Sequence, residues 1–121
     1  MTPSDLANLR LRAMMETECS RGFLTHEVPQ HLREGLREYI VRGRPTGGFL
    51  RAVLENDLVS TVTRADPLSH AGLQAVINFL LDVAPAPAWG SRAKVEAWIA
   101  EGERVNAAAV PPPPPEENWD A

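Results

Sequence analysis

The residues best suited to chemistry lie close together in and beside the stretch GRPTGGFLRAVLENDL, from Gly43 to Leu58. Glycines at the start of a helix let backbone N–H groups point at an anion, and the helix dipole adds about half a positive charge there. Arginines on both sides of the glycines would strengthen such a site. The candidate residues for binding an anionic ligand or a partner are Arg42, Arg44, Gly47, Gly48 and Arg51.

This stretch does not match the phosphate-binding loop of nucleoside triphosphatases. That loop needs G-x-x-x-x-G-K-[ST], but here Gly48 is followed by Phe49 and Leu50 instead of a lysine and a hydroxyl residue. The glycines also have a purely structural interpretation, in which Gly43 ends one helix and Gly47 and Gly48 permit a close contact between helices. Anion binding, contact with a protein and this structural role all remain open.

Asn56 and Asp57 form a second candidate site. We expect both in the middle of a third helix, where asparagine and aspartate are mediocre helix formers. Helical spacing would place Asn56 beside Phe49 and Asp57 beside Val53, next to the buried stripe. The pair then belongs either to a solvated face or to a polar contact with another helix or chain. A single carboxylate supplies no acid and base pair, so no catalytic residue is predicted.

Neither a metal site nor an activated thiol is predicted. His26 and His31 are five residues apart across the start of a helix, which is a poor spacing for two ligands on one helical face. Cys19 is the only cysteine, so no internal disulfide can form. It has no histidine or lysine nearby in the sequence, and we predict a small core residue.

Asp66, Ser69 and His70 resemble the members of a hydrolytic triad only in their residue types. They lie within one turn of a predicted helix, so they cannot surround a substrate from different directions. The simpler interpretation is that Asp66 caps the helix and that Ser69 belongs to its first turn.

Charge argues against a general affinity for nucleic acid. The 121-residue chain has 12 basic and 16 acidic residues and a net charge of -4. A local basic excess occurs between residues 33 and 51, where five arginines stand against two glutamates. A DNA-binding regulator is therefore the weakest of the functional alternatives for this chain.

We expect a cytoplasmic protein. No segment approaches the roughly 20 apolar residues that span a bilayer. The first ten residues, MTPSDLANLR, lack the basic and apolar regions of a signal peptide.

Hydrophobic spacing predicts a single all-α domain over residues 1–109, a compact bundle of about five helices. The first helix would start after Thr2 and stop near Ser20, with Gly22 as its end. In the third helix we expect five apolar side chains to face inward. These are Leu50, Val53, Leu54, Leu58 and Val62. The first four expected helices cover about residues 3–20, 29–43, 48–65 and 67–84, and Ser91 is expected to cap a fifth.

Residues 110–121 read VPPPPPEENWDA and differ sharply in composition from the rest of the chain. Five consecutive prolines favour an extended polyproline conformation and cannot form a helix. We predict a mobile acidic tail that acts as a spacer or as a ligand for an aromatic-lined groove.

A series of short motifs runs through the middle of the chain after Tyr39, Ile40 and Gly43: Gly47 to Leu50 read GGFL, Asn56 to Leu58 read NDL, and, after Pro85, Trp89 to Ser91 read WGS. With Ala65–Asp66 and a final Trp98–Ile99, this pattern resembles a group of small, mostly uncharacterised proteins encoded by bacteriophages and prophages. It covers about half of the chain. Ser69 departs from the pattern, which has asparagine there.

The resemblance implies a phage setting and assigns no catalytic residue. We expect a non-enzymatic protein without a cofactor, which binds a host defence or regulatory protein stoichiometrically and antagonises it. The alternative is a binder that sequesters a small anionic, nucleotide-type ligand. We also expect a homo-oligomer, because the first and fourth helices offer more apolar surface than one small core needs.

Overall fold

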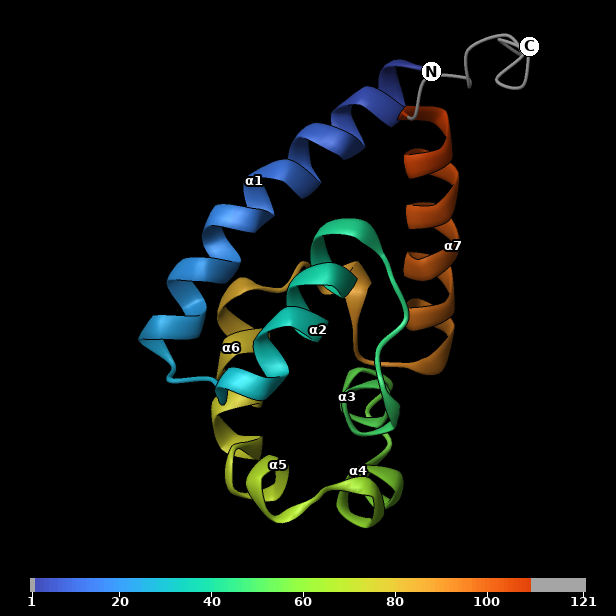
Figure 1. Ribbon diagram of the computed structural model, residues 1–121. Coiled ribbons are helices and arrows are strands. Elements are labelled where there is room, and N and C mark those ends of the chain that lie inside the picture. The colour runs from blue at the N-terminus through green and yellow to red at the C-terminus, as the bar shows by residue number, and fades with distance from the viewer. Residues whose placement is uncertain (1, 110–121) are drawn as a thin grey trace, which may run out of the picture.

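The all-α prediction is confirmed for residues 2–109, which are the residues that the computed structural model describes. The predicted proline-rich tail, residues 110–121, lies outside them. No strand occurs between residues 2 and 109. The elements are α1 (Pro3–Thr25), α2 (Gln30–Arg42), α3 (Gly48–Leu54), α4 (Leu58–Arg64), α5 (Pro67–Ala71), α6 (Leu73–Val83), the 3₁₀ turn η1 (Ala86–Ala88) and α7 (Arg92–Ala109) (Figure 1).

The third expected helix is in fact two helices. Asn56 has a φ of 61°, in the left-handed region, and the chain turns there between α3 and α4. Asp57 then caps α4 by accepting a hydrogen bond from the backbone N–H of Ser60 at 3.1 Å. Asparagine tolerates the left-handed region and aspartate is a preferred N-cap, so both residues favour a break over a continuous helix. The prediction that they lie in mid-helix is wrong.

The fourth expected helix is also divided. Gly72 ends α5 and precedes α6, and its N–H donates to the carbonyl of Leu68 at 3.1 Å. A side chain at position 72 would clash with the ring of Pro29, so glycine permits this close approach of α5 and the start of α2. Within residues 2–109, these two breaks turn the five expected helices into seven.

Helix α1 is longer than predicted, because Gly22 does not end it. The helix continues to Thr25. A Cβ atom at position 22 would lie 2.6 Å from Val83 Cγ2 and 2.9 Å from the ring of Phe79. The glycine therefore lets α6 pack directly on α1, and its role is a helix contact.

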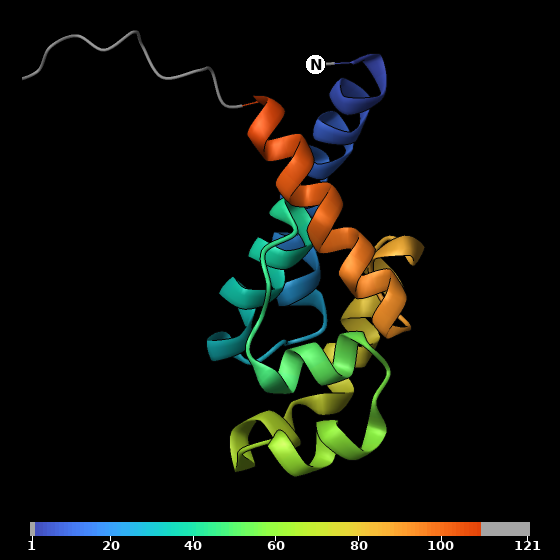
Figure 2. The same cartoon turned by 90° about the vertical axis from the view of Figure 1, so that its right-hand side faces the viewer.

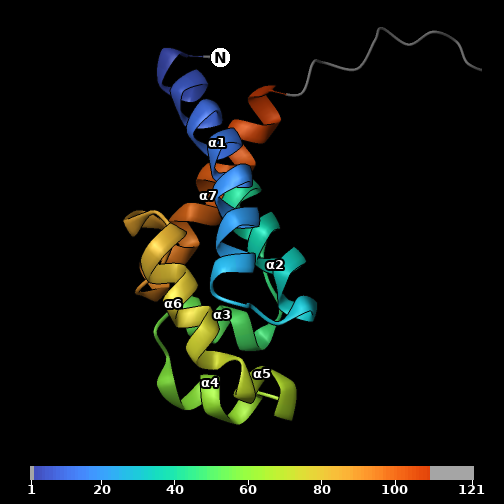
Figure 3. The ribbon, with the colours of Figure 1, turned by 90° about the vertical axis from the view of Figure 1, so that its left-hand side faces the viewer.

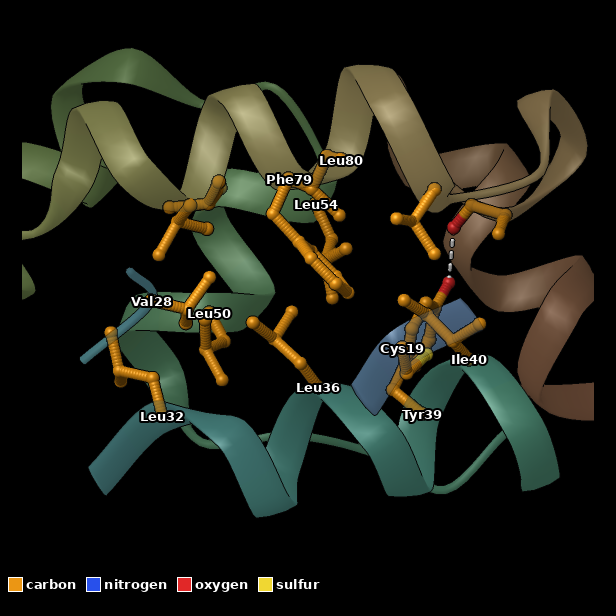
Figure 4. Close-up of a cluster of buried hydrophobic side chains, with 14 of the residues drawn as sticks. Cys19, Val28, Leu32, Leu36, Tyr39, Ile40, Leu50, Leu54, Phe79 and Leu80 are labelled. Atoms are coloured by element: carbon orange, nitrogen blue, oxygen red, sulfur yellow. Dashed lines mark hydrogen bonds between the residues drawn. The ribbon is translucent and has the colours of Figure 1, made fainter. Parts of the chain in front are cut away.

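The core lies between α2 and α6, with α1 and α3 closing its sides (Figure 4). Phe23 and Phe79 stack with their ring centroids 4.8 Å apart. The hydroxyl of Tyr39 donates a hydrogen bond to the carbonyl of Ala88, which fastens α2 to η1. Cys19 is completely buried, and burial raises the pKa of its thiol to about 12. The prediction that Cys19 is a core residue is confirmed.

Helices α1 and α7 pack against the end of α2. Arg12 is buried there, with its guanidinium 4.0 Å from the ring centroid of Trp98. Gly43 ends α2 in the left-handed region, as predicted, with a φ of 73°. A Cβ atom on Gly43 would lie 2.9 Å from the Cα of Gly102 in α7.

The molecule has two distinct ends. The start of α1 and the end of α7 lie at one of them, and α4 and α5 lie at the other in every view (Figures 1, 2 and 3). The core between α2 and α6 occupies the middle. Helix α4 is thus placed at the periphery, with only part of its surface covered by other elements.

Candidate binding surfaces around helix α4

The structure separates the predicted binding residues into groups. Arg42 and Arg44 both pair with Glu38, at 2.9 and 3.5 Å, at the end of α2 that contacts Gly102. Arg51 instead shares a hollow with Arg92, the first residue of α7. Ten residues of α7 separate positions 92 and 102, which corresponds to about 15 Å along the helix. Arg42 and Arg44 therefore do not join Arg51 in one site.

A polar hollow of about 330 Å³ lies between α3, α4 and the first turn of α7. We call it the arginine hollow. Three of the predicted residues, Gly48, Arg51 and Asp57, line it. The complete lining is Gly48, Arg51, Ala52, Glu55, Asp57, Ser60, Arg64 and Arg92. No local sequence pattern groups Arg64 and Arg92 with this stretch, because folding alone brings them to it.

Ion pairs already engage part of this lining. Arg51 Nε pairs with Glu55 at 2.6 Å. The pKa of Asp57 is lowered chiefly by the hydrogen bond from the backbone N–H of Ser60, with a smaller contribution from the nearby charge of Arg64. Asp57 therefore remains an anion at neutral pH and serves as the cap of α4.

Gly47 takes no part in a close contact: a Cβ atom there would have no neighbour within 4 Å. Gly48 differs, because a Cβ atom would lie 2.7 Å from Nη1 of Arg64. The predicted close approach at the paired glycines therefore concerns Gly48 and a guanidinium group.

A smaller hollow of about 160 Å³ lies on the other side of α4, facing α6. We call it the apolar hollow, because none of its lining residues is charged. Asn56 lies at this hollow, whereas its neighbour Asp57 lies at the arginine hollow. The lining residues are Val53, Asn56, Leu58, Thr61, Leu73 and Ile77.

Large apolar side chains are exposed on α4, α5 and α6, and one of them, Leu58, lines the apolar hollow. Leu58 is 72% exposed and Val62 is 49% exposed, so the prediction that both face the core is wrong. The left-handed turn at Asn56 breaks the helical register, and the apolar positions of α4 do not continue the buried stripe of α3. The exposed large apolar residues of α4, α5 and α6 are Leu58, Val59, Val62, Leu68 and Leu81.

Histidines line a third hollow, of about 720 Å³, at the connection between α1 and α2. His31 Nε2 lies 3.0 Å from the hydroxyl of Ser69, a contact between residues 38 positions apart that local sequence spacing could not show. Asp66 caps α5, as predicted, and accepts a hydrogen bond from the N–H of Ser69 at 2.7 Å. Ser69 is buried, so its hydroxyl offers no access to a substrate.

Metal-binding and membrane-spanning features are both absent from the described part of the chain. Residues 2–109 contain no cluster of three or more histidine, cysteine, aspartate or glutamate side chains arranged to hold a metal ion. None of the helices α1 to α7 combines the length and the apolar composition required to cross a bilayer.

Comparison with protein-family models, with curated proteins and with solved structures finds no match to this chain. The surfaces around α4 are therefore the observations from which a function can be inferred.

Proposed function

We propose that the protein acts by stoichiometric binding to another protein, through the exposed apolar side chains of α4, α5 and α6 and the apolar hollow between α4 and α6. The observation that carries this proposal is the exposure of five large apolar side chains on these three helices. Leu58, Val59 and Val62 lie within five residues of one another on α4. Apolar side chains exposed as a group mark sites of interaction in soluble proteins, whereas single exposed apolar residues are ordinary.

The arrangement of the side chains favours an amphipathic helix as the bound segment. Leu58 and Val62 are four residues apart on α4, and Leu73, Ile77 and Leu81 repeat every four residues on α6. Side chains at this spacing share one face of a helix. Leu58, Leu73 and Ile77 of these rows line the apolar hollow, where they could contact the apolar side of a third helix.

The lining also restricts the chemistry of the partner. The six residues of the apolar hollow carry no charge, so a charged group placed there would lose its hydration without gaining an ion pair. The partner should therefore contribute leucine, isoleucine, valine or phenylalanine side chains. The resemblance to phage-encoded proteins suggests that the partner is a host defence or regulatory protein in the bacterial cytoplasm. The protein would antagonise this partner by binding one of its helices.

Affinity capture from a bacterial host, followed by native mass spectrometry, tests this proposal. We expect one host polypeptide bound at a ratio of one to one. Val62→Glu and Leu58→Glu should each abolish the capture, because a buried carboxylate without a partner is strongly unfavourable. Leu11→Glu, at an exposed apolar position of α1, is the matched control and should retain it.

Two results would overturn the proposal. Equal capture by all variants would show that the α4 to α6 surface is not the binding surface. A homodimer that Val62→Glu and Leu58→Glu dissociate, with no host protein bound, would instead assign this surface to self-association, the other expectation drawn from the sequence.

A further inference from the structure

We propose that the arginine hollow binds the phosphoryl group of a small, hydrophilic phosphorylated ligand. Three arginines line it from three different elements: Arg51 in α3, Arg64 in α4 and Arg92 in α7. Arginine presents several N–H donors in a planar fork that matches phosphate oxygens. Cations that converge from separate elements can contact different oxygens of one tetrahedral group.

Arg64 is the central residue of this site. It pairs with no carboxylate within 4 Å among residues 2–109. Its guanidinium lies against Gly48, where a Cβ atom would be only 2.7 Å from Nη1 and 3.3 Å from Cδ. The absence of a side chain at position 48 therefore allows Arg64 to lie across the start of α3, beside the hollow.

The other two arginines retain donors. Arg51 pairs with Glu55 through Nε, and Arg92 pairs with Glu96 through Nε at 3.1 Å. The terminal nitrogens of both guanidinium groups make no hydrogen bond within residues 2–109. The hydroxyl of Ser60 adds a neutral donor on the same side of α4.

Charge and shape define the ligand class. Glu55 and Asp57 also line the hollow, so the three arginines leave an excess of one positive charge. The double charge of a phosphoryl dianion increases its attraction to the arginines and its repulsion from these two acids alike, so the excess positive charge favours it over a single carboxylate. Ala52 is the only apolar side chain of the lining, so a nucleobase or another ring would find no packing surface.

This site is independent of the proposed protein-binding surface. Ser60 and Arg64 lie about 200° and 240° around α4 from Leu58, at 100° per residue. The two hollows have no lining residue in common. Failure of either proposal therefore leaves the other standing.

Isothermal titration of the full-length chain with inorganic pyrophosphate and inorganic phosphate, at constant ionic strength, tests the site. We expect saturable binding of at least one of them to the wild type. Arg64→Gln should weaken the binding about tenfold or more, because it removes a guanidinium group that can donate two charge-assisted hydrogen bonds to phosphate oxygens. Arg64→Lys, which keeps the charge without the fork, should give an intermediate affinity.

Arg44→Gln is the matched control, since Arg44 is an exposed arginine outside the hollow. It should bind like the wild type. Equal weakening by Arg44→Gln and Arg64→Gln would show a diffuse charge effect and overturn the site, and so would the absence of saturable binding at millimolar ligand. Circular dichroism of each variant confirms that it is folded, which the exposed position of Arg64 favours.

Discussion

Helices α3 and α4 have seven residues each and follow one another in the chain, yet they differ in how much of each is buried. Five of the seven residues of α3 are buried, whereas α4 buries only Thr61. The apolar residues of α3 belong to the core, and those of α4 remain at the surface between the two hollows. Apolar composition alone therefore does not distinguish a core helix from one whose apolar side chains stay exposed.

The largest expected effect is a difference between α3 and α4 in how much one substitution changes the free energy of unfolding. Leu54→Ala should destabilise the protein by about 2–5 kcal/mol, because it removes a completely buried side chain and leaves a cavity. Leu58→Ala should change the free energy of unfolding by no more than about 0.5 kcal/mol, because Leu58 is largely exposed. Urea unfolding followed by circular dichroism measures both. Similar losses from the two substitutions would mean that α4 packs in the core after all.

A smaller effect tests the turn that divides the helices. Asn56→Val should cost about 1–2 kcal/mol, because a side chain branched at Cβ is strained at a φ of 61°. Asn56→Gly is the matched control and should be neutral or slightly stabilising, since glycine adopts this conformation without strain. If valine were tolerated as well as glycine, the chain at this position would instead continue as a helix.

The smallest effect concerns the cap of α4. The folded pKa of Asp57 is lowered, so its carboxylate stabilises the fold above the ordinary aspartate value of 3.8, and this contribution is lost as the pH falls through the folded pKa. Asp57→Asn keeps the capping oxygen but cannot titrate. Unfolding midpoints measured between pH 6 and pH 3 should therefore fall less steeply in Asp57→Asn than in the wild type. Parallel curves would exclude Asp57 as a contributor.

Local rules predicted several features correctly. Gly43 ends α2, Asp66 caps α5, and the hydroxyl of Ser91 accepts a hydrogen bond from the N–H of Lys94 at 3.2 Å at the start of α7. Each depends on atoms within a few residues of one another in the chain. Cys19 was predictable as a core residue because no activating neighbour accompanied it.

Other features were mistaken because two physical roles compete for the same residue type. A glycine either ends a helix or permits a close contact, and at Gly22 the contact with α6 decided the outcome. Hydrophobic periodicity continued across Asn56, so the apolar spacing hid a break that the polar pair Asn56–Asp57 had indicated. Asn56 forms the turn that ends α3, and Asp57 caps α4.

The candidate site was predictable only in part. Local patterns pointed to Gly48, Arg51 and Asp57, which line one hollow, and to Asn56, which lines the other. They also pointed to Arg42 and Arg44, which Glu38 holds elsewhere. Arg64 and Arg92 were missed because their approach to Gly48 depends on the path of the chain through α4 to α7, and no local pattern encodes that path.

The sequence by itself determined that residues 2–109 form helices, where several of these helices begin and end, and that no disulfide can form within the chain. These properties follow from backbone preferences and from composition, which act over a few residues or over the chain as a whole. Only the tertiary structure decided which apolar faces are buried and which arginines share a hollow. Those outcomes depend on the relative placement of distant helices, which a left-handed turn at one asparagine is enough to redirect.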